Sequence, residues 1–166
     1  MNEIKLLDKS VYNRIAAGEV VERPLSIVKE LIENSIDAGA TAISIDIENG
    51  GITRIAVSDN GKGISSEDVP TAFMAHATSK IRNIGDLDNI ATLGFRGEAL
   101  PSIAAVSVVK MNTRTCGSET GYSFTVDNGE ITDSGMCGCP VGTSVTVTGL
   151  FDKIPARKKF LKKPAL

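Results

Sequence analysis

The apolar and polar positions of this chain repeat with a helical period at first and with a strand period later. Apolar residues three and four apart predict a helix over residues 24–38, with Pro24 in its first turn and Gly39 at its end. Shorter alternating segments predict strands at residues 42–48, 52–58, 106–113, 122–126, 129–132 and 143–149. The first two strands flank Asn49-Gly50-Gly51, which indicates a hairpin.

The remaining segments complete the predicted fold. They are a short helix from Ser65 or Ser66 to about Met74, a helix from about Gly97 with Pro101 in its first turn, and a basic helix over residues 155–161. Residues 75–96 have weak periodicity and are expected to form a long functional loop. Because helices come mainly first and strands mainly later, we predict an α+β fold, a two-layer sandwich with helices over a mixed, mostly antiparallel sheet.

Composition and charge narrow the class of protein. A chain of 166 residues with 42% hydrophobic positions is expected to form one domain over residues 1–166. The formal net charge of −2 indicates no overall attraction to nucleic acid or to an anionic membrane. Basic residues nevertheless gather near the end of the sequence, at Lys153, Arg157, Lys158, Lys159, Lys162 and Lys163.

Targeting signals and cysteine spacing favour a cytoplasmic protein. No basic segment followed by an apolar run opens the chain, and no stretch approaches the apolar length that a membrane span needs. Cys116, Cys137 and Cys139 lack the second cysteine pair or the histidines that complete a zinc site. We therefore expect reduced thiols and no membrane partner.

One side of the first predicted helix carries candidate chemistry. Its apolar side is expected to consist of Leu25, Val28, Leu31, Ile32, Ser35 and Ile36. Glu30, Glu33, Asn34 and Asp37 lie on the other side, and neither glutamate has Lys or Arg four residues later. Most polar helix faces are simply solvated. This face instead suggests a cation site, in which Glu30 activates a water and the amide oxygen of Asn34 binds Mg²⁺.

Two glycine-rich turns add further candidate positions. Residues 59–63 (Asp-Asn-Gly-Lys-Gly) follow an apolar strand but match neither the Walker A nor the Rossmann phosphate motif. The carboxylate of Asp59 is suited to accept a hydrogen bond from an amino group, although an ordinary Asp-capped turn is an equal alternative. Residues 93–100 place glycines before a helix, which favours a phosphate at its amides. A normally capped helix with Glu98 in its first turn is the alternative there.

Taken in chain order, these three motifs resemble the GHKL ATPases, and more narrowly the ATPase domain of the MutL family of DNA mismatch repair proteins. The segments that read as that family's own are residues 13–24, 29–41, 76–80, 94–100 and 155–161, so the resemblance covers nearly the whole chain. It implies a Bergerat-type sandwich that binds Mg-ATP between helices and sheet and hydrolyses ATP to ADP and phosphate.

The resemblance also implies a role for each matching residue. Glu30 matches the general base, Asn34 the Mg²⁺ ligand, and Asp59 the acceptor for the adenine amino group. The other implied nucleotide-binding positions are Asp37 on the first helix, Gly61 and Gly63 in the site wall, Thr143 near adenine, and Thr78, Ser79, Lys80, Gly94, Phe95, Arg96, Gly97, Glu98, Ala99 and Leu100 in a lid over the phosphates.

A bacterial, nucleoid-associated repair protein of this kind is implied to have several partners besides ATP and ADP. These are DNA without sequence preference, a mismatch-recognition protein of the MutS type, and a second copy of the protein. Since the family's second domain supplies a lysine to the γ-phosphate and the sequence ends at Leu166, we expect slow hydrolysis and a monomer without nucleotide.

Two other interpretations stay open. The first is a DNA-binding or protein-docking module with a vestigial nucleotide site, and the second is another GHKL branch, such as a topoisomerase or chaperone ATPase. Arg157, Lys158 and Lys159, together with Lys162 and Lys163, are candidates for contact with DNA phosphates, although a charge run is more often a solvated helix face.

Overall fold

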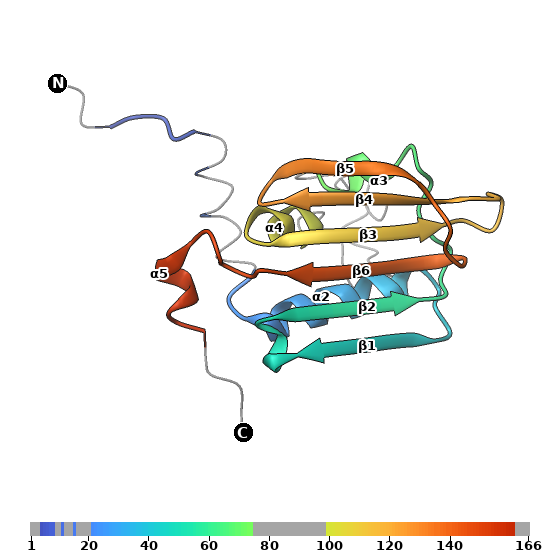
Figure 1. Cartoon of the computed structure of the whole chain (residues 1–166), viewed down its shortest axis with the longest axis horizontal. Coiled ribbons are helices and arrows are strands. Elements are labelled where there is room, and N and C mark those ends of the chain that lie inside the picture. The colour runs from blue at the N-terminus through green and yellow to red at the C-terminus, as the bar shows by residue number, and fades with distance from the viewer. Residues whose placement is uncertain (1–3, 9–10, 12–14, 16–20, 75–98, 162–166) are drawn as a thin grey trace, which may run out of the picture.

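The computed structural model describes residues 4–8, 11, 15, 21–74 and 99–161, and the described segments between residues 24 and 148 form two layers (Figure 1). One layer is a six-stranded sheet in the order β1-β2-β6-β3-β4-β5. Its strands are β1 (Ile43–Glu48), β2 (Arg54–Asp59), β3 (Val108–Arg114), β4 (Gly121–Asp127), β5 (Glu130–Cys137) and β6 (Gly142–Thr148). The helices α2 (Pro24–Asp37) and α4 (Ala99–Ala105) lie together on one face. This confirms the predicted two-layer sandwich.

The sheet is antiparallel at every pairing of its described strands, so the expectation of a mixed sheet is wrong. Of the described helices, α2 precedes the β1–β2 pair and α4 comes between β2 and β3, which are not neighbours in the sheet. Among the described residues, no helix is both long enough and apolar enough to cross a membrane. Cys116, Cys137 and Cys139 are free thiols, as expected.

Helix α2 begins and ends where the sequence predicts. Pro24 occupies its first turn, where a missing amide costs no intrahelical hydrogen bond. Gly39 follows the helix with a φ of 74°, in the left-handed region that glycine enters without strain. The ends of this helix are therefore set by local backbone chemistry.

The buried line of α2 differs from the predicted apolar side. Ile27, Leu31 and Ser35 are its buried residues, whereas Leu25 is 61% and Ile36 is 49% exposed. The helix contacts β2 through these buried residues, which are spaced four apart along α2. The apolar side of the helix is wider than the part that the sheet covers. Hydropathy alone placed Leu25 and Ile36 inside, which is wrong.

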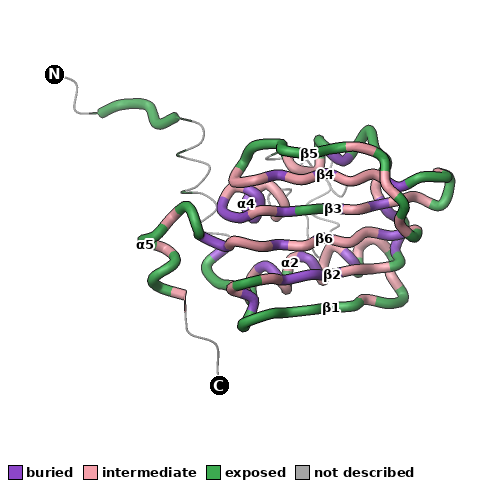
Figure 2. The backbone as a smooth tube through the Cα atoms, viewed as in Figure 1, coloured by how far each residue is buried: buried purple, intermediate pink, exposed green. Residues whose placement is uncertain are grey.

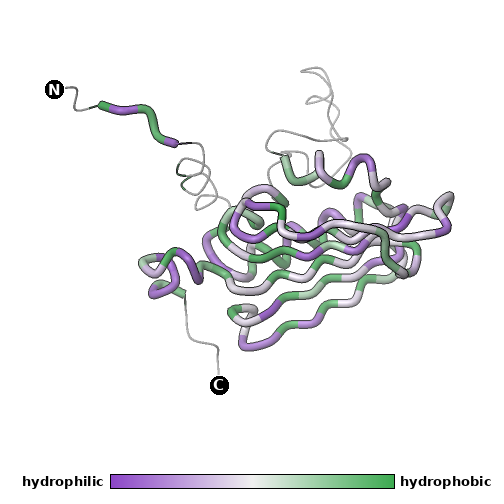
Figure 3. Tube along the Cα trace, turned by 45° about the horizontal axis from the view of Figure 1, so that its top comes forward, coloured by the Kyte–Doolittle hydropathy of each residue, from purple (hydrophilic) through white to green (hydrophobic). Residues whose placement is uncertain are grey.

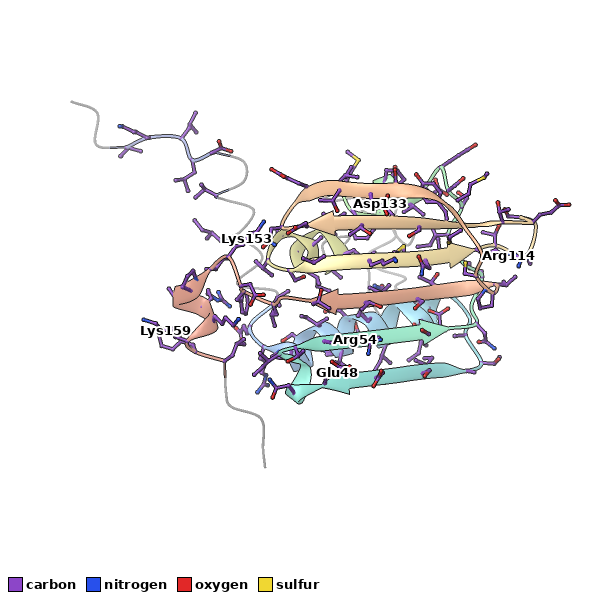
Figure 4. The ribbon with its side chains drawn as sticks, viewed as in Figure 1. Glu48, Arg54, Arg114, Asp133, Lys153 and Lys159 are labelled. Atoms are coloured by element: carbon purple, nitrogen blue, oxygen red, sulfur yellow. The ribbon has the colours of Figure 1, made fainter. Side chains whose placement is uncertain are left out.

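The predicted hairpin joins β1 and β2 through the 3-10 turn η1 (Asn49–Gly51). Asn49, Gly50 and Gly51 have φ values of 53°, 64° and 89°. A Cβ atom on Gly51 would lie 2.7 Å from the Cβ atom of Pro24, so this turn packs directly on the start of α2. On the open face of the sheet, Arg54 binds Asp46 at 2.6 Å (Figure 4).

The hydrophobic core lies between the sheet and the helices. Burial is greatest along the central strands and the inner sides of the helices, while β1 and β5 at the two edges are mostly exposed (Figure 2). The core cluster includes Ile27, Leu31, Ile55, Val57, Val69, Ile103, Val109, Met111, Phe124, Val126, Val145, Val147 and Phe151. Figure 3 shows the matching alternation of hydropathy along the strands. Each fully buried apolar side chain stabilises the fold by about 1.5–3 kcal/mol.

Three predicted boundaries need correction. Strand β5 runs well past residues 129–132, because this edge strand is held by backbone pairing with β4 and shows little hydrophobic pattern. Helix α3 (Val69–Ala72) follows Asp68 instead of starting at Ser65 or Ser66, since the Ser65 hydroxyl donates to the Asp68 carboxylate across a turn. Helix α5 (Pro155–Lys158) is shorter than residues 155–161. The start of the helix near Gly97 and the loop at residues 75–96 lie outside the described residues.

Arg157 attaches α5 to the rest of the domain. Its guanidinium donates a hydrogen bond to the carbonyl of Val21 at 3.1 Å and lies 4.9 Å from the ring centroid of Phe151. Lys158 pairs with Asp152. Two of the five basic residues proposed to contact DNA, Arg157 and Lys158, therefore already have a partner within the domain.

Replacing Gly51 with alanine is expected to destabilise the fold by about 1–3 kcal/mol, because the new Cβ meets Pro24 and the residue keeps a positive φ. The change is measured as a shift of the urea unfolding midpoint. Gly117→Ala is the matched control, since nothing lies within 4 Å of a Cβ built there. Equal shifts for the two variants would contradict this role of the turn.

Replacing Arg157 with methionine is expected to cost about 1–3 kcal/mol of unfolding free energy, through loss of the Val21 hydrogen bond and the cation–π contact with Phe151. Thermal and urea unfolding measure the loss. The control Lys159→Met alters an exposed residue of the same segment and should change stability by less than about 0.5 kcal/mol. A wild-type midpoint for the Arg157 variant would disprove the attachment.

Candidate functional site

A row of polar residues crosses the sheet at the end of β2. Asp59 of β2 lies opposite Thr143 of β6, which lies opposite Thr113 of β3, which in turn lies opposite Tyr122 of β4. Side chains in one cross-strand row point to the same face. Because Asp59 reaches Ser35 on α2, the row faces the helices. Residues from four strands thus form one polar floor.

The carboxylate of Asp59 is held from two sides. The hydroxyl of Ser35 donates to its Oδ2 atom at 2.7 Å, and the amide of Gly61 donates to its Oδ1 atom at 2.8 Å. A carboxylate oxygen accepts more than one hydrogen bond, so Asp59 is oriented and still able to accept from a ligand. Ser35 is 3% exposed, and the sequence had placed it only on the apolar side of the helix.

The glycines of the turn at residues 59–63 are required by packing within the protein. A Cβ atom on Gly61 would lie 2.7 Å from the Cβ atom of Ala38 at the end of α2. One on Gly63, which has a φ of 73°, would lie 2.0 Å from the carbonyl oxygen of Arg114. Arg114 marks this end of β3 in Figure 4. The turn is therefore packed closely between the end of α2 and the end of β3.

Thr113 is the most connected hydroxyl of the row. Its Oγ1 atom accepts a hydrogen bond from the amide of Ile64 at 2.9 Å. It also lies 3.0 Å from the carbonyl oxygen of Gly142 and 2.8 Å from the Oγ1 atom of Thr143. Thr113 is 1% exposed. No sequence motif marks this residue, because it lies in an ordinary alternating strand.

Glu30, Asn34 and Asp37 are half-buried on α2, close in sequence to the Ser35 that holds Asp59. The sequence indicated no basic partner for this side of the helix, but Glu33 has one. The Nζ atom of Lys29 lies 3.9 Å from the Oε1 atom of Glu33. The basic residue therefore precedes the glutamate by one helical turn, whereas the prediction from the sequence considered only basic residues that follow it. Glu30, Asn34 and Asp37 each make an interaction within the chain as well.

The described residues contain no group of three or more His, Cys, Asp or Glu side chains that could hold a metal ion. Mg²⁺ does not need such a group, because it keeps several waters and binds through one or two protein oxygens together with substrate phosphates. The half-buried amide of Asn34 is a hard oxygen donor of this kind. The donor set therefore fits Mg²⁺ that arrives with a nucleotide.

The lid positions are only partly covered by the structure. Ala99 and Leu100 are half-buried at the beginning of α4. The remaining positions, Thr78, Ser79, Lys80, Gly94, Phe95, Arg96, Gly97 and Glu98, lie outside the described residues.

A cavity of about 220 Å³ opens at the part of the row formed by Thr113 and Tyr122. Ile64 and the following turn form its other wall, and most of its lining side chains carry hydroxyl groups. The cavity shares Thr113 with the polar floor. The hydroxyl-lined surface therefore continues beyond the Asp59–Thr143 pair.

Comparison with known proteins gives a family over most of this chain. Residues 23–136 match the family described as histidine kinase-, DNA gyrase B-, and HSP90-like ATPase. The chain is 55% identical over 162 residues to the DNA mismatch repair protein MutL of Desulforamulus reducens, covering 98% of this chain and 25% of that protein. It is 56% identical over 165 residues to the MutL protein of Caldanaerobacter subterraneus subsp. tengcongensis, covering 99% and 28%.

A solved structure agrees with these relatives. The Aquifex aeolicus MutL ATPase domain complexed with ADP superimposes with a TM-score of 0.70 at 37% identity, over 87% of this chain and 50% of that chain. The present chain spans only about a quarter of the length of its MutL relatives. With its helix-covered antiparallel sheet and its matching sequence, the chain belongs to the family of histidine kinase-, DNA gyrase B- and HSP90-like (GHKL) ATPases, as a domain of the MutL type.

Proposed function

We propose that this domain binds ATP together with Mg²⁺ and hydrolyses it slowly, as the nucleotide-driven conformational and dimerisation switch of a MutL-like mismatch repair protein. The observation that carries the proposal is the oriented carboxylate of Asp59, fixed by Ser35 and Gly61 at the end of a central strand. The ADP complex of the Aquifex aeolicus domain supports a nucleotide as the ligand.

The base of the nucleotide is proposed to lie at Asp59 and Thr143. Asp59 accepts from the exocyclic amino group of adenine, and Thr143 lies opposite it in the β2–β6 pair. Both residues sit on hydrogen-bonded strands, so their positions are rigid. Gly61 and Gly63 bring the turn close enough to form the adjoining wall.

The phosphates are proposed to extend along α2. Since Ser35 touches Asp59, a nucleotide with its base at Asp59 passes the half-buried Glu30 and Asn34 on the same helix. Asn34 supplies an oxygen ligand to Mg²⁺, which when bound neutralises phosphate charge. Glu30 orients the attacking water and accepts its proton, a contribution of roughly 10²- to 10⁴-fold. Asp37 adds a polar group near the end of the helix.

The proposed partners other than the nucleotide are partners of the complete protein. We propose that the complete protein binds DNA without sequence preference, a MutS-type mismatch-recognition protein, and a second copy of itself. The rival interpretation as a DNA-binding module has less support, since the Arg157 guanidinium already binds the Val21 carbonyl and the exposed Lys158 is paired with Asp152. Lys159 is exposed and remains a candidate for DNA contact, while Lys162 and Lys163 lie outside the described residues.

Replacing Asn34 with alanine is expected to abolish the Mg²⁺-dependent part of nucleotide binding, because the amide oxygen ligand is lost. Calorimetry with a non-hydrolysable ATP analogue, with and without Mg²⁺, measures this effect. Asn112→Ala is the matched control, since Asn112 precedes Thr113 in β3 and so points to the opposite face of the sheet. Retention of the full Mg²⁺ effect in the Asn34 variant would remove Asn34 from the site.

Replacing Glu30 with glutamine is expected to leave ATP binding within a few fold of wild type and to lower turnover by roughly 10²- to 10⁴-fold, because the general base is neutralised. Phosphate release by the complete protein measures turnover, and calorimetry measures binding. Glu33→Gln, which alters the partner of Lys29, serves as the control and should keep activity. Equal turnover in the Glu30 variant and wild type would exclude this role.

A further inference from the structure

The thiol of Cys139 lies over Gly121 at the beginning of β4. A Cβ atom built on Gly121 would lie 2.2 Å from the Sγ atom of Cys139. Gly121 is directly opposite Cys137 in the β4–β5 pair. Side chains at opposite positions of an antiparallel pair point to the same face, with their Cβ atoms about 4.5–5.5 Å apart. The Cys139 sulfur therefore occupies the place beside the Cys137 side chain that a side chain on β4 would otherwise fill.

A bend after β5 accounts for this position. The strand ends at Cys137, and in a continued strand Cys139 would lie about 6.8 Å farther on, past Gly121. Arg114, at the end of β3, instead holds the segment. Its guanidinium donates to the Cys139 carbonyl at 3.3 Å and to the Ser118 carbonyl at 2.9 Å. The backbone of Cys139 is thus attached to β3 while its thiol turns back toward Cys137.

The two thiols are in contact. Burial raises the pKa of Cys139, and the adjacent Cys137 raises it further, in part through a hydrogen bond between the two side chains. The charge of Arg114 lowers this pKa, but by less. Both cysteines are half-buried, so a small reagent reaches them, whereas Cys116 is exposed. The raised pKa keeps Cys139 protonated at neutral pH and therefore a weak nucleophile.

The pair lies on the face of the sheet that α2 and α4 leave open. Met136 lies opposite Tyr122, which belongs to the polar floor on the helix side. Gly121 and Cys137 are the next positions on these two strands, so they point to the other face. The sheet therefore separates this dithiol from the proposed nucleotide site.

We propose that Cys137 and Cys139 form a reversible redox site, a dithiol that a small disulfide such as oxidised glutathione converts to an intrachain disulfide. The site goes beyond the proposed function, because neither its residues nor its chemistry involve the nucleotide. Closure needs side-chain rotation and no change of strand pairing, since the Cys139 sulfur already lies beside Cys137. The ring closes across the single residue Gly138, and strained or exposed disulfides of this kind are easily reduced again.

The oxidation proceeds by two exchange steps. The Cys137 thiolate attacks one sulfur of the small disulfide, forms a mixed disulfide and releases one thiolate. Cys139 then loses its proton to water and attacks the Cys137 sulfur, which forms the Cys137–Cys139 bond and releases the second thiolate. The dithiol loses two electrons, the small disulfide gains them, and the two cysteine protons end on the two released thiols.

Titration in glutathione buffers tests the proposal. The full chain carrying Cys116→Ser, which removes a competing exposed thiol, is equilibrated at increasing ratios of oxidised to reduced glutathione. It is then quenched with acid, alkylated and analysed by mass spectrometry. The expected product carries neither an alkyl group nor glutathione and is lighter than the reduced chain by two hydrogen atoms. Full alkylation in every buffer, glutathione on both cysteines, or a disulfide-linked dimer would overturn the proposal.

Two further variants, made in the same Cys116→Ser chain, are controls for the intrachain bond. Cys137→Ser and Cys139→Ser each leave a single thiol of the pair, so the second exchange step has no attacking group. Both variants are expected to accumulate a stable adduct with one glutathione. Loss of the adduct at the wild-type rate would show that the second cysteine does not take part.

Gly121→Ala tests the geometry, because the new Cβ displaces the Cys139 sulfur from its place beside Cys137. The equilibrium constant for closure is expected to fall roughly tenfold, which raises the midpoint potential of this two-electron couple by about 30 mV. Gly135→Ala is the matched control, since it alters the strand of Cys137 and nothing lies within 4 Å of a Cβ built there. Equal midpoints for the two variants would contradict the placement on which the site depends. If Gly121→Ala does not fold, the titration of the chain with Gly121 intact still decides the proposal.

Discussion

The antiparallel register of three central strands is the constraint on which the site depends. It places Asp59, Thr143 and Thr113 in one row, although these residues are far apart in the sequence. A slip of one residue in either pairing would turn the row to the opposite face of the sheet. The buried residues of the same strands, such as Val57, Val145 and Met111, prevent this slip because it would expose them to water. The core and the site are therefore held in place by the same register.

Helix α2 links the site to the core in a similar way. Ile27 and Leu31 anchor the helix on β2, and Ser35 on the same buried line donates to Asp59. Glu30 and Asn34 lie beside that line, at the border between buried and exposed surface. The orientation of the polar residues thus depends on how well the apolar residues pack. Flexibility in this helix would loosen both ends of the proposed nucleotide site together.

The strands that hold Asp59, Thr143 and Thr113 are packed closely against neighbouring backbone at three glycines. The turn at residues 59–63 packs against Ala38 through Gly61 and against Arg114 through Gly63. A Cβ atom on Gly142, next to Thr143, would lie 2.0 Å from the carbonyl oxygen of Asp59. Glycine is needed at these positions because no side chain fits between the two backbones. The proposed base site is accordingly a rigid part of the sheet end.

The sequence by itself determined the local features of this protein: the ends of α2, the hairpin at Asn49–Gly51, the two-layer architecture, and the candidates Glu30, Asn34 and Asp59. Each has a signature in neighbouring residues, through proline, glycine, alternation or helical spacing. Only the tertiary structure decided that Ser35 orients Asp59, that Arg157 binds the Val21 carbonyl, and that Thr113 lies within hydrogen-bonding distance of Thr143. These roles depend on contacts between segments that are distant along the chain, and hydropathy along one segment carries no information about a partner on another strand or helix.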